Sequence, residues 1–185
     1  MERETLARKL YEVSHLEGEF VLRSGQVISE YFDKYQFESD PSLLNAVSYH
    51  LAELVPPGAE LLAGIELGGV PLVTALSLRT GLPSVLVHKQ AKEYGTRRLV
   101  EGPAINGKKL VVVDDIISSG AQVIESSQAL VEQGSKILGL ICVIERQHGA
   151  REKIESLGWP LRAIFTEVGL KTLAKGVSEA SASGV

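Results

Sequence analysis

Two adjacent acids and a small polar turn follow an apolar run in the middle of the chain. Residues 110–113 are Leu-Val-Val-Val, Asp114 and Asp115 come next, and residues 118–120 are Ser-Ser-Gly. A turn of this kind before a helix, which we expect to begin near Ala121, directs backbone N–H groups at an anion such as phosphate. Carboxylates repel phosphate, so the two acids suit sugar hydroxyls or a metal ion beside it.

A basic segment precedes this stretch. Residues 89–109 hold six basic and two acidic residues, which gives +4 in a chain whose net charge is −4. Glycines and a proline in the segment argue against one regular element, and a long loop in a compact domain usually has a function. A solvated charge run is the simpler alternative. The six basic residues are Lys89, Lys92, Arg97, Arg98, Lys108 and Lys109.

The elements that must position these residues alternate between strands and helices from residue 61 onward. This pattern predicts an α/β fold with a central, mostly parallel sheet flanked by helices, whose strands end on one rim. The rim would gather residues 66–69, 88–89 and 114–122 with Arg146. We expect strands at residues 61–65, 83–87, 110–113, 137–144 and 161–165, and helices at 2–15, 41–54, 70–79, 121–133 and 150–157, with a helical turn at 169–175.

Residues 20–33 read as a small irregular hairpin, which Glu17-Gly18 separates from the first helix. It would cover the rim as the main part of an N-terminal hood at residues 16–37. We expect a single domain at residues 1–177 and a disordered tail at 178–185.

Composition excludes several classes of function. Hydrophobic residues make up 44% and charged residues 23% of the 185 residues, an ordinary globular balance. The net charge of −4 argues against a nucleic-acid-binding surface, and no apolar run is long enough to cross a membrane. The single cysteine, Cys142, excludes an internal disulfide framework and favours a reducing cytoplasm.

The acidic stretch, taken whole, resembles the phosphoribosyl pyrophosphate (PRPP) motif of type I phosphoribosyltransferases: four apolar residues, two acids, two apolar residues, a hydroxyl pair and glycine. The resemblance implies that family's fold, with the acids on the ribose hydroxyls and the turn around the 5′-phosphate. The PRPP-binding residues from this stretch would be Asp114, Asp115, Ile116, Ile117, Ser118, Ser119, Gly120, Ala121 and Gln122.

Residues 88–95, His-Lys-Gln-Ala-Lys-Glu-Tyr-Gly, look like the catalytic loop of orotate phosphoribosyltransferases. In that family the loop is mobile, closes over the pyrophosphate and reaches into the partner's site in a homodimer. The resemblance places such a loop at about residues 89–107. It adds His88, Lys89, Lys92 and Tyr94 to the PRPP-binding set, with His88 standing where arginine is usual. Lys92 would be catalytic, together with Asp114 and Asp115.

The hairpin is similar to the orotate-binding hood of the same family. The resemblance implies that Arg23 meets orotate or pyrophosphate and that the backbone of Tyr31 and Phe32, with Ser118, contacts orotate. It also implies that Arg146 clamps the orotate carboxylate. An ion pair of Arg146 with Glu145 or Glu152 is the structural alternative. The implied cofactor is Mg²⁺, held mainly by PRPP near Asp114 and Asp115, and the resemblance assigns it no direct protein ligand.

The implied reaction converts orotate and PRPP into orotidine 5′-monophosphate and pyrophosphate. Two alternatives keep the same scaffold. One is transfer to a purine or uracil, which Arg146 disfavours because its guanidinium suits a carboxylate. The other is a non-catalytic, nucleotide-sensing regulator, which the acidic balance and the lack of a helix-turn-helix pattern disfavour.

Overall fold

A six-stranded sheet forms the centre of the protein in the computed structural model, which describes residues 1–185 except 22–24, 26, 90–98, 147–148 and 177–185. The strands lie in the order β5-β4-β3-β6-β7-β8, and only β5 is antiparallel to its neighbour. The predicted α/β fold with a mostly parallel sheet is therefore confirmed. The strands are β3 (Leu61–Ile65), β4 (Ser84–Val87), β5 (Val100–Glu101), β6 (Lys109–Ile117), β7 (Lys136–Glu145) and β8 (Leu161–Thr166).

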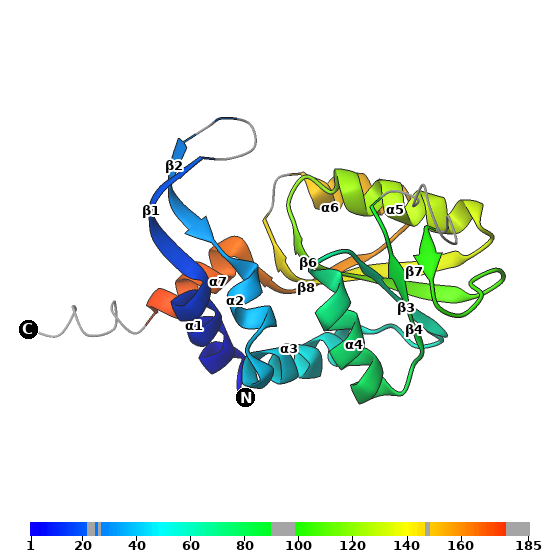
Figure 1. The fold of residues 1–185 in the computed structure, drawn as a ribbon, viewed down its shortest axis with the longest axis horizontal. Coiled ribbons are helices and arrows are strands. Elements are labelled where there is room, and N and C mark those ends of the chain that lie inside the picture. The colour runs from blue at the N-terminus through cyan, green and yellow to red at the C-terminus, as the bar shows by residue number, and fades with distance from the viewer. Residues whose placement is uncertain (22–24, 26, 90–98, 147–148, 177–185) are drawn as a thin grey trace, which may run out of the picture.

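Helices cover both faces of this sheet, with α3 and α4 on one face and α5 and α6 on the other (Figure 1). The alternation of side chains along β6 explains the two layers. Val111 and Val113 pack with the α3 and α4 residues, whereas Leu110 and Val112 pack with α5 and α6. The helices are α1 (Arg3–Ser14), α2 (Lys34–Glu38), α3 (Pro41–Leu54), α4 (Gly69–Thr80), α5 (Ala121–Glu132), α6 (Ala150–Ser156) and α7 (Glu167–Lys175).

Local signals set the ends of several helices where the sequence placed them. The Asp40 carboxylate accepts hydrogen bonds from the backbone N–H groups of Ser42 and Leu43, and Pro41 occupies the first position of α3. Gly81 ends α4 in the left-handed conformation, with φ of 74°. Among the described residues no helix is long and apolar enough to cross a membrane.

The N-terminal hairpin pairs β1 (His15–Val21) with β2 (Val27–Phe32) and stands on α1, α2 and α7, away from the sheet (Figure 1). Its first strand begins directly after α1, so Glu17-Gly18 lies within β1 and does not separate the two elements. The short helix α2 was not predicted. It connects the hairpin to the main domain, because it follows β2 after the single residue Asp33.

Strand β6 is longer than the apolar run predicted. It continues to Ile117, because its backbone keeps pairing with β7 as far as Ile117 opposite Glu145. The two acids therefore lie inside the strand, not after it, and their side chains point to opposite faces of the sheet. Strand β5 was also missed, since it has two residues and pairs only with β4. The remaining elements agree with the prediction within a few residues.

Candidate functional site

Two cavities lie at the carboxyl ends of the strands. The first, about 210 Å³ in volume, is formed by the ends of β3 and β6, the turn before α5 and the first two residues of α2. It brings together nearly all of the predicted PRPP-binding residues that the structure describes. Its lining residues are Lys34, Tyr35, Ile65, Glu66, Leu67, Lys89, Asp114, Asp115, Ile116, Ile117, Ser118, Ser119, Gly120, Ala121, Gln122 and Val123.

The turn before α5 supplies the anion-binding end of this cavity. Gly120 adopts a left-handed conformation with φ of 76°, which a side chain would strain, and its Cβ would also come within 3.2 Å of the Ala150 Cβ. The conformation starts α5 at Ala121 and leaves the first N–H groups of the helix without intrahelical partners. These groups and the Ser118 and Ser119 hydroxyls can bind a phosphate.

The two acids differ in their surroundings. Asp115 is 2% exposed and forms an ion pair with Lys34, whose Nζ lies 2.5 Å from Asp115 Oδ2. Asp114 is half-buried, and its Oδ1 accepts a hydrogen bond of 2.9 Å from the Asp115 N–H. Burial and the negative charge of Asp115 raise the pKa of Asp114 to about 7. A cation or a hydroxyl donor entering the cavity would favour the ionised form of Asp114.

Two further charged residues were missed by the sequence reasoning. Lys34 and Glu38, one turn apart on α2, both approach Asp115. Burial and the neighbouring Asp115 carboxyl group raise the pKa of Glu38 to about 8. No local signal could have found them, since a lysine and a glutamate four residues apart are typical of an exposed helix face.

The turn after β3 closes the other side of the cavity. It contains a cis peptide between Glu66 and Leu67, followed by the buried Gly68, which packs on the Asp115 carboxylate. The Glu66 carboxylate accepts hydrogen bonds from His88 Nδ1 at 2.6 Å and from the Lys89 backbone N–H at 2.7 Å. Although burial acts in the opposite direction, these bonds hold the pKa of Glu66 below its usual value.

His88 therefore contacts protein groups. Its ring binds Glu66 and lies 3.9 Å from Glu101 on its other side, and it does not line the cavity. Lys89, the next residue, is exposed and does line it. The predicted loop residues Lys92 and Tyr94 lie outside the described part of the chain, as does Arg23 of the hood.

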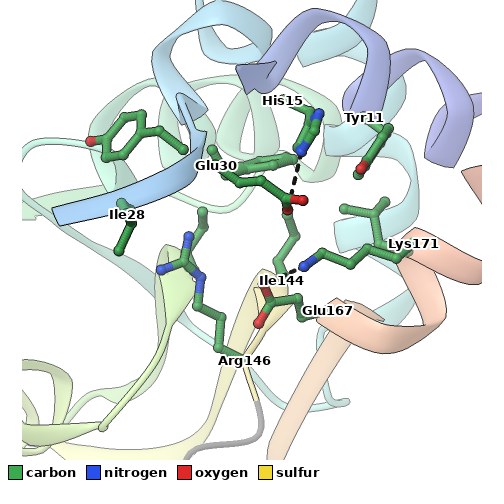
Figure 2. A pocket seen from close by; sticks show the side chains of 12 residues that line it. Tyr11, His15, Ile28, Glu30, Ile144, Arg146, Glu167 and Lys171 are labelled. Carbon is green, nitrogen blue, oxygen red and sulfur yellow. Dashed lines mark ion pairs between the residues drawn. The ribbon is translucent and has the colours of Figure 1, made fainter. Parts of the chain in front are cut away.

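The second cavity, about 190 Å³ in volume, lies beneath the hairpin. Arg146 enters it from the end of β7 and points toward the hairpin, while Glu167 and Lys171 enter it from α7 (Figure 2). The predicted residues Tyr31 and Phe32 also line it. The full lining is Tyr11, His15, Ile28, Glu30, Tyr31, Phe32, Ile116, Ile144, Arg146, Glu167, Leu170 and Lys171.

Nearby ion pairs leave the Arg146 guanidinium directed at this cavity. The Glu145 carboxylate, 2% exposed, is bound by Arg151, with Arg151 Nε 3.1 Å from Glu145 Oε1. The alternative pairing of Glu145 with Arg146 is thus wrong. Inside the cavity His15 pairs with Glu30 at 3.3 Å, and Lys171 pairs with Glu167 at 3.4 Å.

Ile116 joins the two cavities. It lines both of them, together with Asp115 in the first cavity and with Ile144 in the second. A ligand in the anion-binding cavity would therefore lie next to a ligand beneath the hairpin. Among the described residues, no group of three or more His, Cys, Asp or Glu side chains could hold a metal ion by itself.

The sequence and fold place this chain in a family. Residues 45–159 match the phosphoribosyl transferase domain, which defines the class of protein. A curated relative from Nocardioides sp. is 42% identical over 90% of this chain and 93% of its own length, and one from Methanopyrus kandleri is 39% identical over 97% and 98%. Both are orotate phosphoribosyltransferases. The chain belongs to the orotate phosphoribosyltransferase family.

Solved structures agree with this assignment. Orotate phosphoribosyltransferase from Mycobacterium tuberculosis superposes with a TM-score of 0.81 at 27% identity, covering 91% of this chain and 98% of that one. The Aeropyrum pernix enzyme superposes with a TM-score of 0.79 at 29% identity, covering 94% and 98%. The predicted type I phosphoribosyltransferase fold is thereby confirmed.

Proposed function

We propose that the protein transfers the phosphoribosyl group of PRPP to orotate and releases orotidine 5′-monophosphate and pyrophosphate, a step of pyrimidine biosynthesis. The observation that carries this proposal is the pair of adjoining cavities. One combines an anion-binding turn with two acids, the other offers an arginine beneath a hairpin, and Ile116 lines both. A phosphorylated sugar and a carboxylated base could therefore meet there.

PRPP would occupy the cavity at the end of β6. Backbone N–H groups and hydroxyls of residues 118–122 would bind the 5′-phosphate, and Asp114 and Asp115 would accept hydrogen bonds from the ribose hydroxyls. Lys89 would contact the pyrophosphate from the opposite wall. Lys92 and Tyr94 are proposed to contact it as well, from the partner subunit of a homodimer.

Orotate would lie beneath the hairpin. The Arg146 guanidinium suits a bidentate contact with the orotate carboxylate, which places the ring near Tyr31 and Phe32. Their backbone groups, with Arg23 and Ser118, are proposed to complete the recognition of the base. A purine or uracil lacks the carboxylate and would leave Arg146 without a partner, which disfavours transfer to those bases.

The transfer needs positioning and charge stabilisation more than covalent help from the protein. The bond between ribose C1 and the pyrophosphate breaks early, with its electron pair leaving on the pyrophosphate oxygen. Orotate N1 forms the new bond from the opposite face with inversion, and the N1 proton passes to the departing pyrophosphate or to water. Residues 118–122 and Arg146 hold the two reactants in line, and the lysines stabilise the negative charge on the leaving group. The covering hairpin and loop would exclude water, which would otherwise hydrolyse PRPP.

The site fits a magnesium ion that arrives with PRPP. Carboxylates are suitable oxygen ligands for Mg²⁺, but Asp115 already pairs with Lys34. The ion would therefore be held mainly by PRPP oxygens, near Asp114 and Asp115. When bound, Mg²⁺ would neutralise charge on the departing pyrophosphate. A cytoplasmic location accords with these phosphorylated substrates and is part of the proposal.

A panel of bases tests the proposed function. The protein is incubated with PRPP, Mg²⁺ and, separately, orotate, uracil, adenine or hypoxanthine, and pyrophosphate release is measured. Of these four bases, we expect only orotate to support pyrophosphate release. Removal of Mg²⁺ with EDTA should abolish this release. Release with another base in place of orotate would favour the alternative transferase, and PRPP binding without release would favour the nucleotide-sensing regulator.

A further inference from the structure

Lys34 occupies an unusual position for a residue from the hood. It is the first residue of α2, two positions after Phe32, which lines the cavity beneath the hairpin. Its own side chain lines the other cavity, is 31% exposed, and reaches Asp115 at 2.5 Å. Lys34 thus brings a positive charge from the hairpin side of the molecule to a buried acid of the central sheet.

The surroundings of Asp115 make this charge important. Asp114 is its neighbour in the strand, Glu38 approaches it from α2, and Gly68 packs on its Oδ2 atom. Among the charged groups described in contact with Asp115, Lys34 is the only cation. Without it, three carboxyl groups would share one partly dehydrated site. The Asp115 carboxylate would then lose its fixed orientation, because an unpaired charge is unfavourable there.

We propose that Lys34 is a positioning residue for PRPP, which acts by holding the Asp115 carboxylate in the orientation that accepts a ribose hydroxyl. This inference rests on the proposed function and deepens it. As a carboxylate, Asp115 offers acceptor lone pairs to a ribose hydroxyl and carries no competing O–H donor. The Lys34 ammonium supplies the counter-charge at Oδ2, and together with the Ile116 N–H, which donates to Oδ1, it fixes the carboxylate in the wall of the cavity.

A purely structural ion pair is the competing explanation. In that case Lys34 fastens α2 to the sheet, and its loss lowers stability while the folded protein still binds PRPP normally. The two explanations differ in the kinetic constant affected. A positioning role changes KM for PRPP and leaves KM for orotate nearly unchanged, because Arg146 and the hairpin, not Asp115, are proposed to hold orotate.

The test compares Lys34→Met and Lys34→Arg with wild type in the full chain. KM for PRPP, KM for orotate, kcat and thermal stability are measured at pH 7.5 with Mg²⁺. Loss of a partly buried ion-pair partner leads us to expect a rise of about tenfold or more in KM for PRPP in Lys34→Met. Lys34→Arg, which keeps the charge, should recover most of it.

Lys108→Met is the matched control. Lys108 lies just before the opposite end of the same strand, where its Nζ is 3.2 Å from Glu60 Oε1. This variant removes an ion-paired lysine far from both cavities, so all kinetic constants should stay within threefold of wild type. If Lys34→Met does not fold, Lys34→Gln, with the same expected effect, replaces it.

A double-mutant cycle tests whether Lys34 acts through Asp115. In an Asp115→Asn background, Lys34→Met should add less than threefold to KM for PRPP, since the carboxylate on which it acts is gone. Full additivity of the two effects would overturn the proposal, as would an unchanged KM for PRPP in folded Lys34→Met. Wild-type protein that releases no pyrophosphate with PRPP and orotate would instead refute the proposed function.

Discussion

Gly68 allows a sharp test of the geometry around the acids. A Cβ atom added to this glycine would lie 1.4 Å from Asp115 Oδ2 and 3.0 Å from Glu38 Oε1. In real proteins a Cβ atom essentially never lies closer than 3.0 Å to an atom of a residue that is not its chain neighbour. In Gly68→Ala, either the Asp115 carboxylate or the turn after β3 must therefore move by about 1.6 Å, the difference between these two distances.

The loss of activity that we expect in Gly68→Ala comes from this steric collision alone. Gly68 has φ of −65° and ψ of −29°, a conformation that alanine adopts without strain. A misplacement of about 1 Å in an active site can reduce the rate about 100-fold. We therefore expect kcat/KM for PRPP to fall by about 100-fold or more, which corresponds to about 2.7 kcal/mol of transition-state stabilisation.

Initial rates at saturating orotate and varied PRPP measure this loss, with thermal unfolding of each variant beside them. Gly58→Ala is the control, because Gly58 has φ of 83° and its Cβ would meet no atom within 4 Å. That substitution strains the backbone away from both cavities and should lower stability alone. A Gly68→Ala enzyme with kcat/KM within threefold of wild type would refute this account of how Asp115 is enclosed.

Three further predictions concern other charged groups. Arg146→Lys should raise KM for orotate about tenfold and leave KM for PRPP unchanged, since lysine keeps the charge but loses the bidentate geometry; equal rises in both constants would contradict this. Arg151→Met removes the counter-charge of the buried Glu145. We expect a loss of about 2 kcal/mol in urea unfolding, with kinetic constants unchanged. Because burial and Asp115 raise the pKa of Glu38 from 4.5 to about 8, folded protein keeps a proton there that unfolded protein releases, so stability falls as pH rises through this window. Glu38→Gln removes this dependence and should unfold at a higher temperature than wild type at pH 8 but not at pH 4; parallel curves at every pH would count against it.

The alternation of strands and helices was predictable because each element carries its own local signal. Residues 61–65 form a continuous apolar run and became β3 with the bounds expected. Asp40-Pro41 and Gly81 gave the start and end of helices in the same way. The elements that were missed lack such signals. Helix α2 has five residues, and Phe37 is buried by packing against distant helices, which no local pattern reveals.

The same distinction between local and non-local signals applies to the residues of the candidate site. The turn at residues 118–120 and the acids before it were recognisable because they are contiguous in the sequence. Lys34 was not, since its partner lies 81 positions further along the chain, and only the folded hairpin brings them together. The resemblance implies that His88 contacts PRPP, and this stays a prediction. In the structure the Glu66 carboxylate binds the His88 ring. Whether the ring contacts a protein group or a ligand depends on the fold, and the local motif does not reveal it.

The cavity beneath the hairpin is built from both ends of the described chain. Tyr11 and His15 come from the first helix and strand, whereas Leu170 and Lys171 come from α7, the last element, and α1 packs on α7. During synthesis on the ribosome, all the residues that line the other cavity are present once Val123 has been added to the chain. The cavity beneath the hairpin, in contrast, can close only after Lys171 has left the ribosome. Completion of this second cavity therefore requires translation of both α1 and α7, which lie more than 150 residues apart in the sequence.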